Sequence, residues 1–218
     1  MRIKPLAVIT LLVAVLLAAC SDANRSADTG GVVQAVTCEY PPDGRPARAV
    51  DPPATTDIPN QGQAQATLHF TAGDVTITMD RAKAPCTINS FLSLAQQGFY
   101  DETNCHRLVD YGLFILQCGD PTATGMGGPG YVMDEELDGK ETYPAGTVAM
   151  AKRPERGTTG SQFFLVWADT ELPPDYTVLG TMDKAGLDVI GGIAAQGVAA
   201  SDGQSPNAEA RITSITLG

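Results

Sequence analysis

The sequence has few aromatic residues and few basic ones. Aromatic residues make up 6% of the chain, with a single Trp, and 14 Lys and Arg stand against 25 Asp and Glu, for a formal net charge of -11. Proteins that bind nucleic acid need basic patches that neutralise phosphate. Nucleic acid is therefore not expected as a partner, and the acidity mainly favours solubility.

Residues that hold metals and cofactors are also scarce. The chain has two histidines, His69 and His106, and no Cys-x-x-Cys pair, so no zinc site is expected. Gly125–Gly130 fits the pattern G-x-G-x-x-G, but it follows a long loop, contains Pro129 and opens no helix, unlike a dinucleotide-binding loop. No serine stands in a nucleophile-elbow context, and His106 is expected to be structural. The sequence predicts neither a metal nor a cofactor.

One long apolar run occurs, at the N-terminus. Pro5 to Ala19 follows Arg2 and Lys4 and spans 15 residues, fewer than the roughly 20 of a membrane helix. It ends in Leu17-Ala18-Ala19-Cys20, a bacterial lipobox, in which the thiol accepts a diacylglyceryl group. We expect residues 1–19 to be a lipoprotein signal peptide and Cys20 to be lipidated, which would anchor the protein outside the cytoplasm on the bacterial cell membrane. The alternative is an ordinary signal peptide that is cut before Cys20.

The other four cysteines are an even number, as disulfides require. In an oxidising compartment, Cys38, Cys86, Cys105 and Cys118 are expected to form disulfides, although four cysteines allow three pairings. Cys105 and Cys118 lie on two strands of an expected hairpin and are one candidate pair. Buried free thiols are the alternative.

The chain divides into a tether and one domain. Residues 20–65 combine the lipidated cysteine with a proline-rich stretch that lacks hydrophobic periodicity, so an extended, flexible tether is expected. Cys38 is the place where this tether could be pinned to the body. Residues 66–218 form the expected globular domain.

The domain alternates short apolar strands with two helices. Ala66–Phe70 and Val75–Met79 flank a turn and predict a hairpin. Helices are expected from Pro85 through Gln97 and over Ala185–Gln196. Further strands are expected at Cys105–Val109, Leu113–Gln117, Gly146–Ala151, Ser161–Trp167, Tyr176–Met182 and Ala210–Leu217. These elements predict a mainly β fold, a closed eight-stranded antiparallel β-barrel capped by two α-helices.

Arg107 is the residue most indicative of chemistry. Because side chains alternate along a strand, it faces away from His106 and Leu108. Gln117 comes from the partner strand and could accept a hydrogen bond from the guanidinium, which would give a preorganised donor in a partly dry groove. The alternative is a surface arginine paired with an acidic loop.

Several long motifs in fixed order resemble the cyclophilins, a family of peptidyl-prolyl cis–trans isomerases. The resemblance covers residues 66–217. It rests on G-F-Y-D-x-T-x-x-H-R (Gly98–Arg107), Q-x-G-D-P-T-x-T-G-x-G-G-P-G-Y (Gln117–Tyr131), G-T-V-A-M-A (Gly146–Ala151), G-S-Q-F-F (Gly160–Phe164) and L-P-P-D-Y-T-V-L-G (Leu172–Gly180). It implies an eight-stranded antiparallel barrel with two capping helices, in agreement with the strand count.

The resemblance also implies residue roles. It implies that Arg107, Phe114 and Gln117 are catalytic. Substrate contacts are implied for Ile115, Ala151, Gln162, Phe164, Leu172 and Tyr176. The implied substrates are proline-containing polypeptides, with assistance to the folding of exported proteins as the expected task and a monomer as the expected state. The alternatives are a non-catalytic proline-peptide module or holdase and, less in keeping with the chain length, a solute-binding lipoprotein.

The sequence departs from the family pattern at four places. Cys105 replaces an aromatic residue, two extra residues lengthen the hairpin tip in Val109–Leu113, and Lys152 stands where many members have asparagine. A tryptophan that helps many members to bind cyclosporin is missing between Glu171 and Leu172.

Overall fold

The computed structural model describes residues 35–218. The predicted signal peptide, the predicted lipidation site at Cys20 and the first part of the predicted tether lie outside the described residues. Within residues 35–218, no helix is both long and apolar enough to cross a membrane.

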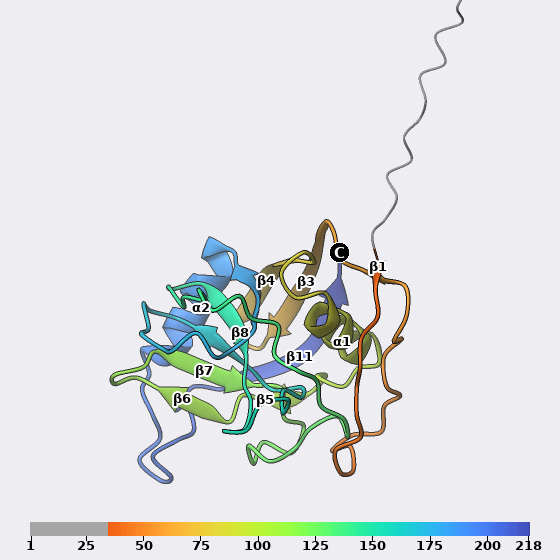
Figure 1. Ribbon diagram of the computed structural model, residues 1–218. Helices are drawn as coiled ribbons and strands as arrows, with labels where there is room; N and C mark the ends of the chain where they lie inside the picture. The colour runs from red at the N-terminus through yellow and green to blue at the C-terminus, as the bar shows by residue number, and fades with distance from the viewer. Residues whose placement is uncertain (1–34) are drawn as a thin grey trace, which may run out of the picture. The chain divides into compact units, whose positions relative to one another are not determined.

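The domain is built on one curled antiparallel sheet (Figure 1). Its nine strands are β3 (Gln63–Phe70), β4 (Gly73–Asp80), β5 (Thr103–Asn104), β6 (Arg107–Val109), β7 (Ile115–Cys118), β8 (Thr147–Met150), β9 (Phe163–Val166), β10 (Val178–Met182) and β11 (Arg211–Leu217). The order across the sheet is β5-β11-β3-β4-β10-β8-β9-β7-β6. The hairpin of β3 and β4 turns through Gly73, whose φ of +138° disfavours other residues.

The two edge strands of this sheet are consecutive in the chain. Only Cys105 and His106 separate β5 from β6. The Cys105 N–H donates to the Ala210 carbonyl beside β11, and the His106 N–H donates to the Gln117 carbonyl in β7. The bent segment Thr103–Val109 thus pairs with β11 at one end of the sheet and with β7 at the other end. If this segment is counted as one strand, the sheet has eight strands. The predicted mainly β, antiparallel fold with two helices is confirmed.

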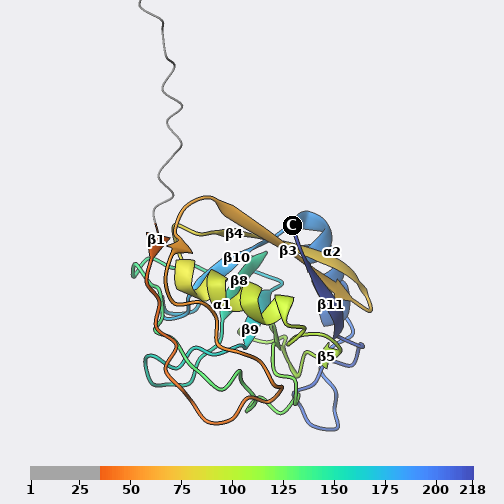
Figure 2. The ribbon, with the colours of Figure 1, turned by 90° about the vertical axis from the view of Figure 1, so that its right-hand side faces the viewer.

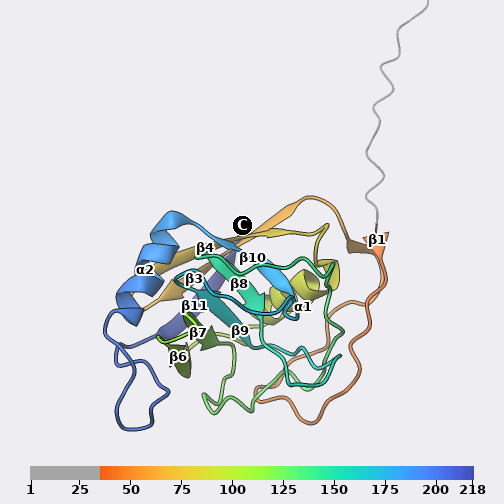
Figure 3. The ribbon, with the colours of Figure 1, turned by 60° about the vertical axis from the view of Figure 1, so that its left-hand side comes forward.

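Helices α1 (Pro85–Gln96) and α2 (Lys184–Ala194) lie at opposite sides of the sheet (Figures 1 and 3). Both ends of α1 are explained by the residues found there. Pro85 occupies the first turn, and Gly98, just beyond the last turn, has a φ of +69°. The buried residues of α1 include Ile88 and Phe91, one turn apart on the face that covers the core. Asp183 caps α2, because its carboxylate accepts the Gly186 N–H over 2.7 Å.

The proline-rich segment differs from the expectation. A flexible tether was predicted through residue 65, whereas residues 35–65 pack on the domain. β1 (Ala35–Val36) and β2 (Ile58–Pro59) pair with each other, and residues 37–57 between them, here called the strap, run beside α1 (Figure 2). Composition did not reveal this packing because the contacts that hold the strap are specific and distant in sequence.

Three kinds of contact fix the strap. A disulfide joins Cys38 to Cys86 in the first turn of α1. At the other end of the helix, Arg48 Nη1 donates to the Gly98 carbonyl over 2.6 Å and to the Asp101 carbonyl over 2.7 Å, where a cation complements the helix dipole. The side chain of Tyr40 is buried in the core between these anchors.

The second disulfide joins Cys105 to Cys118, the candidate pair of the sequence analysis. It links the bent β5–β6 segment to β7. All four cysteines of the described residues are therefore paired, and the alternative of buried free thiols is wrong.

Candidate functional site

The site centres on a cross-strand pair in the β6–β7 hairpin. Arg107 lies opposite Gln117 in the antiparallel register, and Val109 lies opposite Ile115. Arg107 Nη1 donates to Gln117 Oε1 over 3.3 Å. Leu108, which lies between Arg107 and Val109 in β6, is buried in the core. The alternation predicted for Arg107 and Leu108 is confirmed.

A chain of amides extends from this pair. Gln117 Nε2 donates to Gln162 Oε1 over 2.8 Å, and Gln162 Nε2 donates to the carbonyls of Gly125 and Gly127 over 2.9 and 3.0 Å. Carbonyl oxygens only accept hydrogen bonds, so they fix the orientation of the Gln162 amide and in turn that of Gln117. Gln117 therefore presents its oxygen to Arg107.

Arg107 has no ion-pair partner among residues 35–218. The alternative of an arginine paired with an acidic loop is therefore not what the structure shows. A guanidinium carries five N–H donors, and the only side-chain hydrogen bond that Arg107 makes in the described residues is the one to Gln117. The half-buried Arg107 is thus oriented by a neutral amide and keeps donors for another group.

An apolar wall stands beside the Arg107–Gln117 pair. Ile115 and Phe164 are buried in a small cluster, separate from the main core, on which Ala151, Leu172 and Tyr176 pack. Phe163 and Phe164 are adjacent in β9, so Phe163 points into the main core while Phe164 belongs to this wall. The structure thus brings together five of the six predicted substrate contacts here, and the sixth, Gln162, belongs to the amide chain.

Tyr143 supports this wall and was not predicted. Its ring is buried, its hydroxyl donates to the Tyr176 carbonyl over 2.9 Å, and the same oxygen accepts the Tyr176 N–H over 3.0 Å. The Tyr176 ring in turn meets Phe164 edge-on at 5.5 Å between centroids. No spacing pattern in the sequence relates Tyr143 to Tyr176, because the contact depends on tertiary structure alone.

Phe114 lies at the edge of the site, just before β7. It is half-buried and meets Trp167 edge-on, with 5.0 Å between ring centroids. The Trp167 N–H donates to the Phe114 carbonyl over 3.0 Å, and the Phe114 N–H donates to Thr170 Oγ1 over 3.0 Å. Phe114 is not part of the Phe164 cluster. Trp167, its neighbour, was missed by the sequence analysis.

Asp120 organises the glycine-rich loop that carries the two carbonyls for Gln162. Its carboxylate is buried and accepts the backbone N–H groups of Thr122 (2.7 Å), Thr124 (3.1 Å), Gly125 (2.7 Å) and Gly127 (3.0 Å). Burial raises the pKa of Asp120, but hydrogen bonds from Thr122, Gly127 and Gly125 outweigh it and hold the pKa below its usual value. Asp120 was not predicted, although an aspartate at the start of a loop that contains proline, threonine and glycine is a typical turn residue.

His106 is buried beneath this loop. Burial lowers its pKa, so the imidazole is neutral at pH 7, and Nδ1 has no hydrogen-bond partner within the described chain. Burial fits the structural role expected for His106 from the sequence, whereas the unpartnered Nδ1 does not, and that role stays a prediction.

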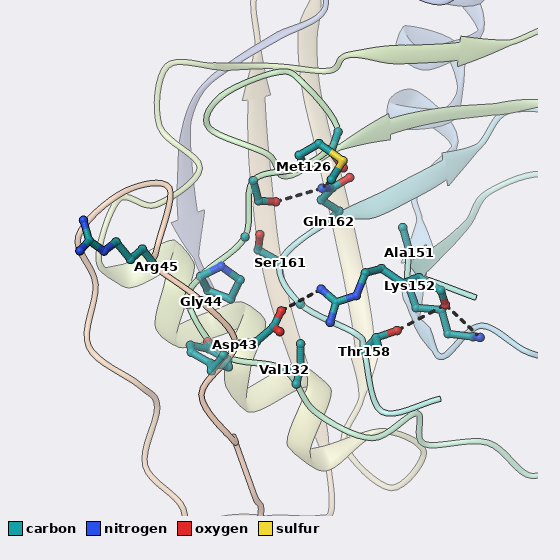
Figure 4. Close-up of a pocket in the computed structure, with 18 of the residues that line it drawn as sticks. Asp43, Gly44, Arg45, Met126, Val132, Ala151, Lys152, Thr158, Ser161 and Gln162 are labelled. Carbon is teal, nitrogen blue, oxygen red and sulfur yellow. Dashed lines mark hydrogen bonds and ion pairs between the residues drawn. The ribbon is translucent and has the colours of Figure 1, made fainter. Parts of the chain in front are cut away.

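A pocket of about 430 Å³ continues the site on the side of Gln162 (Figure 4). It shares Gln117, Ala151 and Gln162 with the residues described above. Its other walls come from the glycine-rich loop, from Lys152–Arg153 and Thr158 after β8, and from the strap at Asp43–Arg45. The pocket therefore adjoins the amide chain at Gln117 and Gln162 and the Phe164 wall at Ala151.

Comparisons with known proteins agree with this arrangement. The sequence profile of the family described as "Cyclophilin type peptidyl-prolyl cis-trans isomerase/CLD" matches residues 65–217. The "Probable peptidyl-prolyl cis-trans isomerase B" of Mycobacterium leprae is 40% identical over 198 residues, which cover 84% of this chain and 67% of the relative. Its counterpart in Mycobacterium tuberculosis (strain H37Rv) is 41% identical over 199 residues, which cover 83% of this chain and 63% of the relative. The match thus spans about two thirds of the length of these relatives.

Solved structures show the same fold. A cyclophilin type peptidyl-prolyl cis-trans isomerase of Cryptosporidium parvum superposes with a TM-score of 0.65 at 26% identity, over 72% of this chain and 98% of that chain. A second structure of that protein, in the presence of the dipeptide Ala-Pro, gives a TM-score of 0.63 over 71% of this chain and 98% of that chain. The chain belongs to the cyclophilin type peptidyl-prolyl cis-trans isomerase family.

Proposed function

We propose that this chain accelerates rotation about Xaa-Pro bonds, with Arg107 as the catalytic cation. The observation that carries the proposal is the placement of Arg107: it lacks a carboxylate partner in the described residues, is oriented by Gln117, and lies beside the apolar wall of Ile115 and Phe164. Such a site offers a proline ring an apolar surface and the adjacent peptide bond a preorganised donor.

The uncatalysed reaction defines what the site has to do. Rotation about a peptide bond is opposed by amide resonance, with a barrier of roughly 18–20 kcal/mol, and takes tens to hundreds of seconds at an Xaa-Pro bond. Since no covalent bond breaks, the reaction requires neither a nucleophile nor a cofactor. A group that interacts more strongly with the twisted amide than with either planar isomer lowers the barrier.

In the mechanism that we propose, Ile115, Phe164 and Leu172 grip the proline ring, while Gln162 and the Ala151 backbone hold the flanking peptide. As the bond twists, resonance is lost and the prolyl nitrogen becomes pyramidal and basic. Arg107 donates toward this nitrogen and stabilises the twisted state. The amide chain keeps the guanidinium in place, so little reorganisation accompanies the rotation.

A binding module without catalysis is the alternative function. NMR exchange spectroscopy on a short Ala-Pro-containing peptide separates the two. Accelerated cis–trans exchange at substoichiometric protein is the expected result. Chemical-shift changes from binding, without accelerated exchange, would favour the module and contradict the proposal.

We further propose that the protein acts outside the cytoplasm, lipid-anchored through Cys20, on exported polypeptides. The lipobox Leu17-Ala18-Ala19-Cys20 supports the anchor, and the two disulfides suit an oxidising compartment. Expression in a bacterium that is fed a labelled fatty acid tests the anchor. Label is expected on the wild type and not on Cys20→Ser; equal labelling of both would contradict lipidation at Cys20.

A further inference from the structure

The pocket beside Gln162 lies within reach of residues near a bound proline. It shares Gln117, Ala151 and Gln162 with the proposed catalytic site, so the two adjoin. An extended polypeptide advances about 3.3–3.6 Å per residue. A peptide whose proline rests on the Phe164 wall therefore brings the side chain of a residue close to the proline into this pocket.

The pocket is rich in positive charge, although the chain as a whole is acidic. Arg45, Lys152 and Arg153 line it, against the single carboxylate of Asp43. Two of the three cations are engaged elsewhere or directed away. Lys152 Nζ lies 3.3 Å from Asp175 Oδ2 and 5.9 Å from the Tyr176 ring centroid, and its side chain is only 4% exposed. The Arg45 side chain points away from the other lining residues in Figure 4.

Arg153 is the cation that remains for a ligand. Its Nη1 lies 2.8 Å from Asp43 Oδ2, an ion pair that Figure 4 shows as a dashed line at Asp43. The side chains of Arg153 and Asp43 are 52% and 39% exposed, and Asp43 is the only side-chain acceptor of Arg153 in the described residues. Ion pairs this exposed are weak and screened by water, so another carboxylate can exchange for Asp43 or bind the unused N–H donors.

The strap holds Asp43 at this position. The Asp43 N–H donates to the Gly130 carbonyl over 2.9 Å, and the Ala47 N–H donates to the Gly128 carbonyl over 2.9 Å. The disulfide at Cys38 and the contacts of Arg48 anchor the strap on either side. Asp43 is thus a fixed neighbour of Arg153, and it comes from a segment outside the barrel.

From this geometry we propose that the pocket selects substrates with an acidic side chain close to the proline, that Arg153 binds this side chain, and that Asp43 of the strap competes with it. The inference rests on the proposed isomerase function. Asp43 pairs with Arg153 when the pocket is empty and is displaced by a substrate carboxylate. Because this ion pair has to be broken, the preference for an acidic side chain is moderate. A lysine at the same substrate position meets the like charge of Arg153 and is disfavoured.

A peptide series tests the proposal on the full domain with its strap. Each peptide is an alanine-rich pentapeptide with proline at the central position. One of the other four positions carries Glu, Gln or Lys, and NMR exchange measures kcat/KM for each peptide. We expect Glu to exceed Gln by about threefold at one position, the size of a partly exposed ion pair. Asp43→Asn should enlarge this ratio, Arg153→Gln should reduce it to about one, and 0.5 M salt should diminish it.

The matched control is Arg156→Gln. Arg156 lies in the same loop as Arg153, is exposed and does not line the pocket, so this variant removes the same charge and should keep the wild-type Glu-to-Gln ratio. A ratio that is equal in the wild type and in Arg153→Gln, or that Arg156→Gln changes as much as Arg153→Gln does, overturns the proposal. Should the wild type accelerate every peptide equally, the selection fails while the isomerase function stands; acceleration of no peptide contradicts the isomerase function itself.

Discussion

Gln117 and Arg107 face each other across the β6–β7 ladder, and the amide oxygen of Gln117 accepts a hydrogen bond from the guanidinium over 3.3 Å. The orientation of that amide is inherited from Gln162, whose own amide is fixed by two backbone carbonyls of the glycine-rich loop. The position of the proposed catalytic cation thus depends on a loop to which the Arg107 side chain donates no hydrogen bond in the described residues.

Gln117→Leu tests this dependence. The substitution keeps the approximate volume but removes the acceptor, so Arg107 samples other rotamers and the catalysed exchange rate should fall about ten- to a hundredfold. Gln65→Leu is the matched control, because Gln65 is an exposed residue of β3 whose side-chain amide, within residues 35–218, bonds only to Thr78. NMR exchange on an Ala-Pro peptide measures both. An unchanged rate in Gln117→Leu would show that the amide does not position Arg107.

Two neighbouring glycines of the loop should respond differently to alanine. A Cβ at Gly127 would clash with the Asp120 carboxylate, whereas a Cβ at Gly128 would meet nothing within 4 Å. Gly127→Ala should therefore destabilise the domain by about 1–3 kcal/mol, as expected for a strained buried hydrogen-bond network, while Gly128→Ala should stay within about 0.5 kcal/mol of the wild type. Urea unfolding compares the two, and equal stabilities would contradict the packing of this loop.

The Asp120 carboxylate should make the free energy of unfolding depend on pH in the acidic range. Hydrogen bonds hold its pKa below the ordinary value of 3.8 in the folded protein, so its contribution is present above that pH and is lost as the pH falls through the folded-state pKa. Asp120→Asn leaves several buried N–H groups facing an amide NH2 and should cost about 1–3 kcal/mol at pH 7. Unfolding at pH 3 and at pH 7 is the measurement. The difference between variant and wild type should be smaller at pH 3, and a larger one would contradict the ionised, hydrogen-bonded carboxylate.

The Cys105–Cys118 disulfide should stabilise the hairpin that carries Arg107. The two cysteines are 13 residues apart, for which chain entropy predicts a loss of about 3 kcal/mol on replacement of both by serine. Cys38 and Cys86 are 48 residues apart, and their replacement should cost about 4 kcal/mol and release the strap. Urea unfolding of the two double variants, with the wild type measured oxidised and reduced, checks both values. Wild-type stability in either double variant would show that its crosslink does not constrain the fold.

The barrel was predictable from local signals. Short segments of sequence are enough to predict these elements. Examples are the alternating strand Val75–Met79, the proline at the start of α1 and the glycine after the end of α1. The pairing of Arg107 with Gln117 was also accessible, because strand alternation and the hairpin connection put both on one face. The motifs that resemble the cyclophilins supplied the roles of Phe164 and Leu172, which remain predictions.

Other features depend on contacts that no local pattern contains. The strap was expected to be flexible because its composition is rich in proline, yet Cys38, Tyr40 and Arg48 each find a partner more than 40 residues away. Tyr143 and Trp167 support the site through tertiary packing alone.

The central claim is that Arg107 stabilises the twisted peptide bond, and NMR exchange spectroscopy of Arg107→Ala on an Ala-Pro peptide tests it most directly. Arg107 makes no ion pair in the described residues and is only half-buried, so the variant should fold with wild-type secondary structure. Removal of one preorganised donor typically costs about 10²–10³ in rate, and a loss of that size with peptide binding retained is the expected result. Exchange at close to the wild-type rate in a folded Arg107→Ala variant would contradict the account.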